Sequence, residues 1–157
     1  MRRIALVLIA AISLTLAFSA CNDNGTVKDI PVDEIMSKVI EDTDLDTNMI
    51  VQSENQVIVS YGINLSLLEE HSVKISKNIV SANTIAIFKL KDVKDIVAFQ
   101  NSVNKRKNDM IDLFQDYAPA ESDLAMNSIA MTKGRYILFV VSKDAEKVKA
   151  AFEKMFK

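Results

Sequence analysis

The sequence has few of the residues that reactive or disulfide-stabilised proteins depend on. Its 157 residues include one cysteine, one histidine, three glycines, two prolines and no tryptophan. A single cysteine excludes an internal disulfide, and one histidine leaves too few ligands for an ordinary zinc site. Three glycines supply no glycine-rich phosphate loop, and the missing tryptophan argues against a carbohydrate-binding platform. We therefore expect no cofactor. Of the seven methionines one is the start residue, and we interpret most of the others as core residues.

The first twenty residues have the layout of a secretory signal. Arg2 and Arg3 precede the apolar stretch IALVLIAAISLTLAF, and small residues follow it. This stretch is shorter than the about 20 apolar residues of a bilayer-spanning helix. We therefore expect residues 1–20 to be a signal peptide that takes no part in the fold.

The lone cysteine, Cys21, follows directly after this segment. The tetrad Phe18-Ser19-Ala20-Cys21 resembles the lipobox of bacterial lipoproteins, with phenylalanine at a position that is usually leucine. The resemblance implies cleavage before Cys21, a lipid on its sulfur, and attachment to the extracytoplasmic face of the cell membrane. The alternative is an ordinary secreted protein with a free thiol near its N-terminus.

Behind Cys21 the composition predicts a short tether and a single domain. Residues 21–30 are polar and we expect them to form a lipidated tether, while residues 31–157 are long enough for one core. Cleavage would remove Arg2 and Arg3, leaving 17 of the 19 basic side chains against 21 acidic ones, a formal charge of −4. An acidic domain is a poor partner for nucleic acid.

Hydrophobic spacing along the domain alternates between helix and strand patterns. We expect helices over about 32–41, 65–71 and 92–117, and a last one from Ser142 or Asp144 to the C-terminus. We expect strands at 56–61, 84–90, 128–132 and 135–141. Residues 42–55 have the composition of a turn. Pro119 should end the long helix, and Lys133-Gly134 should form the turn of a β-hairpin.

This order predicts an α+β fold. Its C-terminal β-α-β-β-α unit places strand 135–141 between two partner strands. We expect a mostly antiparallel sheet of about four strands with the helices packed on one face.

Ordered landmarks along the domain resemble one family of small bacterial lipoproteins. The landmarks are Tyr61-Gly62-Ile63, IAIFKLKD at 85–92, Lys105-Arg106, FQDYAP at 114–119, Lys133-Gly134-Arg135-Tyr136 and SKDA at 142–145. In order and spacing they are similar to the domain of unknown function 4358. The resemblance covers about residues 31–157. It implies a short envelope lipoprotein, and it implies no activity or catalytic residue.

An acidic turn is the one candidate metal site. Asp42, Asp44 and Asp46 alternate as the first ligands of an EF-hand loop do. The loop's sixth position, a glycine in EF-hands, is Thr47, and its twelfth, a glutamate, is Ser53. We hold a solvated acidic turn as the stronger interpretation and a calcium site as the weaker one.

The remaining polar candidates favour structural roles over chemistry. His71 neighbours Glu69 and Glu70, but no nucleophile elbow accompanies it. The run NKRKN at 104–108 could bind anionic groups, and we expect it to be the exposed face of the long helix. Tyr61-Gly62 could line a groove, and we expect it to end a strand.

Two function classes follow from these observations. The first is a non-catalytic binding or interaction module on an anchored lipoprotein, with an envelope protein as a possible partner. The second is a cell-envelope hydrolase whose acid and base lie among the 21 carboxylates. A shallow surface with exposed apolar side chains would favour the first class, and two carboxylates facing each other across a deep pocket would favour the second.

Overall fold

A five-stranded antiparallel sheet organises the protein, for which a computed structural model describes residues 27–43, 45 and 48–157. The strand order is β1-β2-β3-β5-β4, and every neighbouring pair is antiparallel. The strands are β1 (Met49–Val51), β2 (Leu68–Ser76), β3 (Thr84–Leu90), β4 (Ile129–Lys133) and β5 (Tyr136–Val141). The α+β class and the antiparallel sheet are confirmed, and β5 lies between β3 and β4 as expected.

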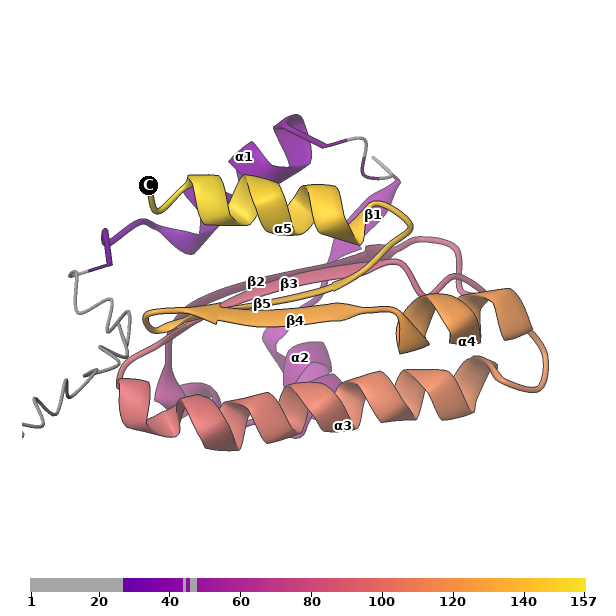
Figure 1. Cartoon of the computed structure of the whole chain (residues 1–157). Helices are drawn as coiled ribbons and strands as arrows, with labels where there is room; N and C mark the ends of the chain where they lie inside the picture. The colour runs from indigo at the N-terminus through magenta and orange to yellow at the C-terminus, as the bar shows by residue number, and fades with distance from the viewer. Residues whose placement is uncertain (1–26, 44, 46–47) are drawn as a thin grey trace, which may run out of the picture.

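Helices cover both faces of the sheet (Figure 1). The helices of one face are α2 (Glu54–Tyr61), α3 (Ile96–Phe114) and α4 (Pro119–Met126), and those of the other are α1 (Val32–Glu41) and α5 (Ala145–Lys154). The expectation of helices on one face is thereby corrected. Every residue of β3 and of β5 is buried, and because alternate side chains point to opposite faces, such strands need a layer on each side.

The sheet therefore separates two apolar cores. The α3-side core joins Tyr61 and Phe99 to the strand residues Phe88 and Phe139. The α1-side core joins Ile35 and Phe152 to the alternate residues of the same strands. The alternation of the strands thus assigns each buried side chain to one core or the other.

Residues 54–61 form helix α2. The strand predicted at 56–61 from the alternating valines is therefore wrong. The Gln56 side chain accepts a hydrogen bond from the Ser53 N–H at 2.7 Å, which satisfies a free amide at the helix start. Gly62 ends the helix with a φ of 61°. Val57 and Tyr61, one turn apart, are buried while Val59 is exposed. Capping and a helical burial period outweigh the β-propensity of the valines here.

The other boundaries depart from expectation mainly at short elements. The helix expected over 65–71 is a 3₁₀ turn, η1 (Leu65–Leu67), followed directly by β2. The long helix expected over 92–117 opens as a 3₁₀ turn, η2 (Val93–Asp95), and continues as α3. It does end before Pro119, which then begins the unexpected helix α4.

The predictions for the N-terminal segment concern residues outside the described part of the chain. The signal peptide at 1–20 and the lipidated Cys21 are both among them. Within the described residues, none of the helices combines the length and the apolarity that crossing a bilayer requires.

Replacing Gly134 by alanine should destabilise the protein more than replacing Gly62. Both glycines have a positive φ, 55° and 61°, at which alanine costs about 1–2 kcal/mol. A Cβ on Gly62 would meet nothing within 4 Å, whereas a Cβ on Gly134 would lie 2.7 Å from Cγ2 of Val27. We expect urea unfolding to give the larger loss for Gly134→Ala. Equal losses would show that Val27 does not rest on the hairpin.

Candidate functional site

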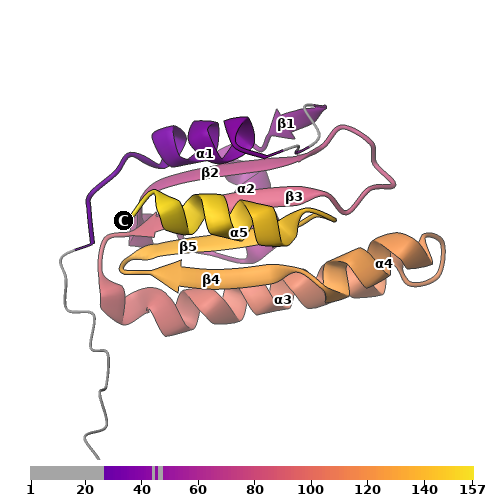
Figure 2. The ribbon, with the colours of Figure 1, turned by 45° about the horizontal axis from the view of Figure 1, so that its top comes forward.

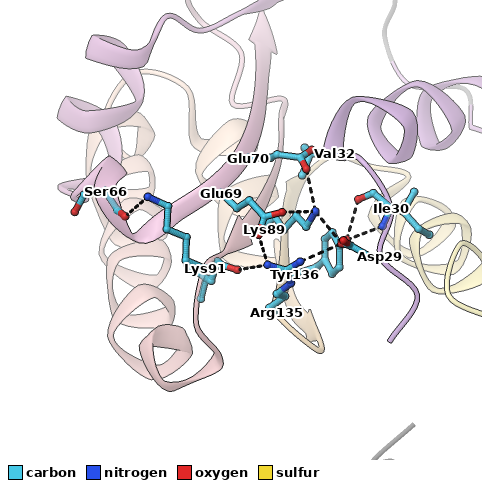
Figure 3. A network of polar contacts seen from close by, with 11 residues as sticks. Asp29, Ile30, Val32, Ser66, Glu69, Glu70, Lys89, Lys91, Arg135 and Tyr136 are labelled. Carbon is cyan, nitrogen blue, oxygen red and sulfur yellow. Dashed lines mark hydrogen bonds and ion pairs between the residues drawn. The ribbon is translucent and has the colours of Figure 1, made fainter. Parts of the chain in front are cut away.

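A cluster of charged side chains surrounds Lys89 near the end of β3 (Figure 3). Lys89 faces the α1-side core, and its side chain is only 3% exposed. Its Nζ lies 2.8 Å from a carboxylate oxygen of Asp29, 2.8 Å from one of Glu69 and 2.9 Å from one of Glu70. A buried ammonium without partners would be very costly, so this position in the sheet depends on those carboxylates.

Arg135 and Tyr136 extend the cluster at the start of β5. The Arg135 guanidinium donates to Glu69 and lies 3.1 Å from Asp29. The Tyr136 hydroxyl accepts a hydrogen bond from the Ile30 N–H at 2.8 Å, and its proton faces both the Ile30 carbonyl at 2.8 Å and Asp29 at 3.0 Å. Two cations thus meet three carboxylates in one closed network.

Glu70 connects the network to helix α1. The residue before the helix, Pro31, has no side chain that could cap it. Glu70 instead accepts a hydrogen bond from the Val32 N–H at 2.6 Å, which satisfies a free amide at the positive end of the helix dipole. We refer to Asp29, Glu69, Glu70, Lys89, Arg135 and Tyr136 as the Lys89 clamp. The clamp holds residues 29–32 against three strands of the sheet.

The protonation states of the clamp suit a structural role. Burial pulls the pKa of Lys89 down, but its hydrogen bonds to Asp29, Glu69 and Glu70 outweigh burial and raise that pKa above its usual range. The hydrogen bond from Lys89 also holds the pKa of Asp29 and of Glu69 below their ordinary values of 3.8 and 4.5. A permanently protonated lysine is no nucleophile, and carboxylates with lowered pKa are weak bases.

A groove of about 290 Å³ opens on the α3-side face, at the other end of β3 from Lys89. Its floor is the sheet, its wall is α3, and its rim is the turn between β2 and β3. The lining residues are Ile50, Ile75, Ser76, Lys77, Asn78, Ile79, Ser81, Thr84, Arg106, Met110, Leu113 and Phe114. Three of the apolar ones are well exposed: Ile50 at 41%, Leu113 at 54% and Ile79 at 91%. The groove is therefore largely apolar and uncovered.

Arg106 brings an incompletely satisfied charge to this groove. Arg106 is half-buried as a residue, and its Nε is buried without a hydrogen-bond partner. The buried Tyr61 hydroxyl also has no partner. Burial raises the pKa of Tyr61 above its usual range, and the nearby charge of Arg106 opposes that rise. Unsatisfied buried polar atoms cost stability, so the described residues leave the Nε of Arg106 and the hydroxyl of Tyr61 without compensation.

The acidic turn is only partly described. Asp44 and Asp46 lie outside the described residues. Asp42 lies 3.1 Å from Lys38 and 3.4 Å from Lys154, and the hydrogen bond from Lys38 lowers the pKa of Asp42. In the described part of the chain, no three His, Cys, Asp or Glu side chains are placed to hold a metal. Two lysines thus lie beside the one aspartate of this turn that the structure describes.

His71 does not join a catalytic arrangement with its neighbours in sequence. It is half-buried in β2, opposite Phe88 of β3. Glu69 and Glu70, the carboxylates beside it in the chain, are bound to Lys89 instead. Tyr61 also differs from expectation, because it lies in the core at the end of a helix and not at the end of a strand.

The basic run at 104–108 divides between two environments. Lys105 is exposed and lies 2.6 Å from Asp109, and Lys107 donates to the Met126 carbonyl at 2.7 Å. Arg106 turns to the groove instead. A sequence signal was present, since position 106 lies three residues after Val103 and four before Met110, on the apolar stripe of α3.

The Lys89 clamp was not predicted, although its centre carries a signal. Lys89 is the one charged residue in TIAIFKL, a segment whose apolar pattern predicts a fully buried strand. A buried lysine predicts carboxylate partners. Which carboxylates they are depends on strand register and on where residue 29 lies, and neither is visible in the sequence.

Comparison with known proteins adds a family and no activity. The model of a family described as "Domain of unknown function (DUF4358)" matches residues 41–142, more than half of the chain. No curated protein and no solved structure matches the chain. The matched range contains the groove and five of the six clamp residues, and it begins after the sixth, Asp29.

Substituting Lys89→Met should lower the free energy of unfolding by about 3 kcal/mol, because it leaves three carboxylates together without their buried cation. The matched control is Lys94→Met, which removes the ion pair of Asp92 with a lysine whose side chain is 74% exposed, and it should have little effect. Urea unfolding measured by circular dichroism compares the two variants. A loss no larger for Lys89→Met than for the control would contradict a structural clamp.

Acidification should remove the contribution of the clamp. The folded pKa of Asp29 and of Glu69 lies below the ordinary value, so their contribution is present above those ordinary values and is lost as pH falls through the lowered ones. The double variant Asp29→Asn/Glu69→Gln should be less stable than wild type at neutral pH. Urea unfolding should show this difference shrinking between about pH 5 and pH 1. A difference that is independent of pH would contradict ionic docking of the entering segment.

Proposed function

The chain belongs to the family described as Domain of unknown function (DUF4358), and from that premise we propose that it is a lipoprotein anchored at Cys21 on the extracytoplasmic face of a membrane. Its α+β domain is a non-catalytic binding module. The observation that carries the binding role is the open groove at Arg106, where exposed apolar side chains surround an incompletely satisfied guanidinium.

The Lys89 clamp supports the proposed anchor because it fixes the end of the sheet at which the chain from Cys21 enters the domain. It holds residues 29–32 at the end of the sheet where β3 ends and β5 begins. Val27 follows Cys21 by six residue steps, a reach of at most about 20 Å. A lipid on Cys21 would therefore keep this end of the domain close to the membrane surface.

The groove lies at the opposite end of the sheet. Figures 1 and 2 place the entering chain and the C-terminus at one end, and the β2–β3 connection with α4 at the other. From Thr84 in the groove to Lys89 in the clamp, β3 spans five residue steps, about 17 Å at 3.4 Å per residue. An anchored domain would thus present its groove away from the lipid attachment point.

The hydrolase alternative receives less support from the described residues. Glycoside hydrolases place two carboxyl groups on either side of the scissile bond, one of them with a raised pKa. Asp29, Glu69 and Glu70 do converge, but on the ammonium of Lys89, and the pKa of Asp29 and of Glu69 is lowered. This convergence favours docking of the chain over acid–base chemistry.

Substituting Cys21→Ser should release the protein from the membrane. Both proteins are expressed in a bacterial host that is fed an alkyne-tagged fatty acid. The wild-type protein should carry the tag, and the Cys21→Ser variant should not. Fractionation should move the variant out of the membrane pellet, while Lys94→Met should behave as wild type in both measurements. A variant that stays in the pellet, together with an untagged wild type, would refute the lipid anchor.

A further inference from the structure

We propose that the groove at Arg106 binds an extended acidic segment of a partner protein. Apolar side chains of that segment lie on the groove floor, and one of its carboxylates meets the guanidinium of Arg106. This inference rests on the proposed binding function and names the ligand class of the same site.

The charged side chains of the groove are cationic, so they favour a negatively charged ligand. Of the described residues that line it, Arg106 and Lys77 are cationic and none is acidic. Arg106 is half-buried and its Nε has no partner, so its charge gains more from an incoming anion than that of a fully hydrated lysine would. Carboxylates form the strongest charge-assisted hydrogen bonds with arginine, often in pairs. An acidic ligand would therefore complete the charge balance that the fold leaves open.

The apolar walls require more of the ligand than a negative charge. Ile50 on the floor, Leu113 on α3 and Ile79 in the turn are all well exposed at the groove. Ile79 is 91% exposed, at a turn position where polar residues are the rule. Covering these side chains removes apolar surface from water and contributes about 25 cal/mol per Å². The ligand therefore needs apolar groups next to its carboxylate.

The edge of the sheet favours a polypeptide over a small amphiphile. Ile50 belongs to β1, which is the outermost strand in the sheet order. The Asn48 carbonyl accepts a hydrogen bond from the Lys77 N–H, directly after β2, and the Gln52 N–H donates to the Val73 carbonyl of β2. Backbone groups that face the neighbouring strand alternate with groups that face away from it, so those of Met49 and Val51 face the outer edge of the described sheet. An extended segment can add to such an edge while its alternate side chains enter the adjoining groove.

The place and shape of the groove fit the same partner. The β2–β3 connection that forms its rim lies at the end of the sheet away from the entering chain (Figure 1), so a lipid surface at Cys21 is not its natural ligand. Its volume of about 290 Å³ lies at the lower limit for small-molecule pockets, which enclose most of their ligand. An uncovered groove of this size suits one or two side chains of a longer chain.

Binding of a designed peptide to the full-length protein in neutral phosphatidylcholine nanodiscs tests this inference. The probe is a short fluorescent peptide of alternating valine and glutamate, followed by anisotropy. Wild type should bind it, and Arg106→Gln should weaken binding about tenfold, as expected for loss of a charged hydrogen bond. Leu113→Ser should also weaken it. The matched control Lys105→Gln, on the exposed side of α3, should bind as wild type does.

Two further probes define what would overturn the inference. Wild type should bind a valine–glutamine peptide more weakly than the valine–glutamate peptide. The Arg106→Gln variant should bind the two peptides with equal affinity. No binding of the acidic peptide to wild type, or binding that Arg106→Gln leaves unchanged, would refute the acidic partner. Arg106-dependent binding of octanoate without peptide binding would assign the groove to a small amphiphile instead. The anisotropy of the peptide reports binding to the groove whether or not Cys21 carries a lipid, so these outcomes are independent of the anchor test.

Stability measurements separate a ligand-binding arginine from a structural one. The partnerless Nε of Arg106 lowers stability, so Arg106→Met should leave the midpoint of thermal unfolding unchanged or raise it. A lowered midpoint would show that the guanidinium supports the fold, and would overturn its assignment to a partner.

Discussion

The buried ammonium of Lys89 is the constraint on which the arrangement of this protein depends. It lies in a strand that is covered on both faces, where an uncompensated charge could not be tolerated. Two of its carboxylate partners, Glu69 and Glu70, come from the neighbouring strand, but the third, Asp29, comes from the chain that enters the domain. Neutralising one lysine therefore also determines where the polypeptide joins its own sheet.

The second layer of helices follows from this docking. Glu70 bonds Lys89 with one carboxylate oxygen and the first amide of α1 with the other. The same carboxylate thus neutralises a strand residue and caps a helix 38 residues earlier in the chain. Once α1 is held there, Ile35 and Val39 complete the α1-side core beside α5. A buried ionic network adds little net stability compared with apolar residues in place of all its members. Its contacts nevertheless hold α1 in one position.

The two polar features of the molecule differ in how completely the fold satisfies them. Within the clamp, Lys89 and Arg135 both meet carboxylates, and the shared proton of Tyr136 has two acceptors. The half-buried Arg106 lies among apolar side chains and keeps an unpaired nitrogen. A satisfied network can be explained by the fold alone, whereas an unsatisfied charge beside exposed apolar surface indicates a ligand. This contrast is why the groove, and not the larger cluster, carries the functional proposal.

Local patterns in the sequence determined the α+β class, the bounds of α1, the β4–β5 hairpin and the place of β5 between β3 and β4, because spacing, turn glycines and caps act over a few residues. They were misleading at α2, where valines and capping residues point to different structures. The second helical layer, the partners of Lys89 and the inward turn of Arg106 were decided only by tertiary structure. The reason is sequence distance: Asp29 meets Lys89 across 60 residues and Ile30 meets Tyr136 across 106, and no local pattern carries that information.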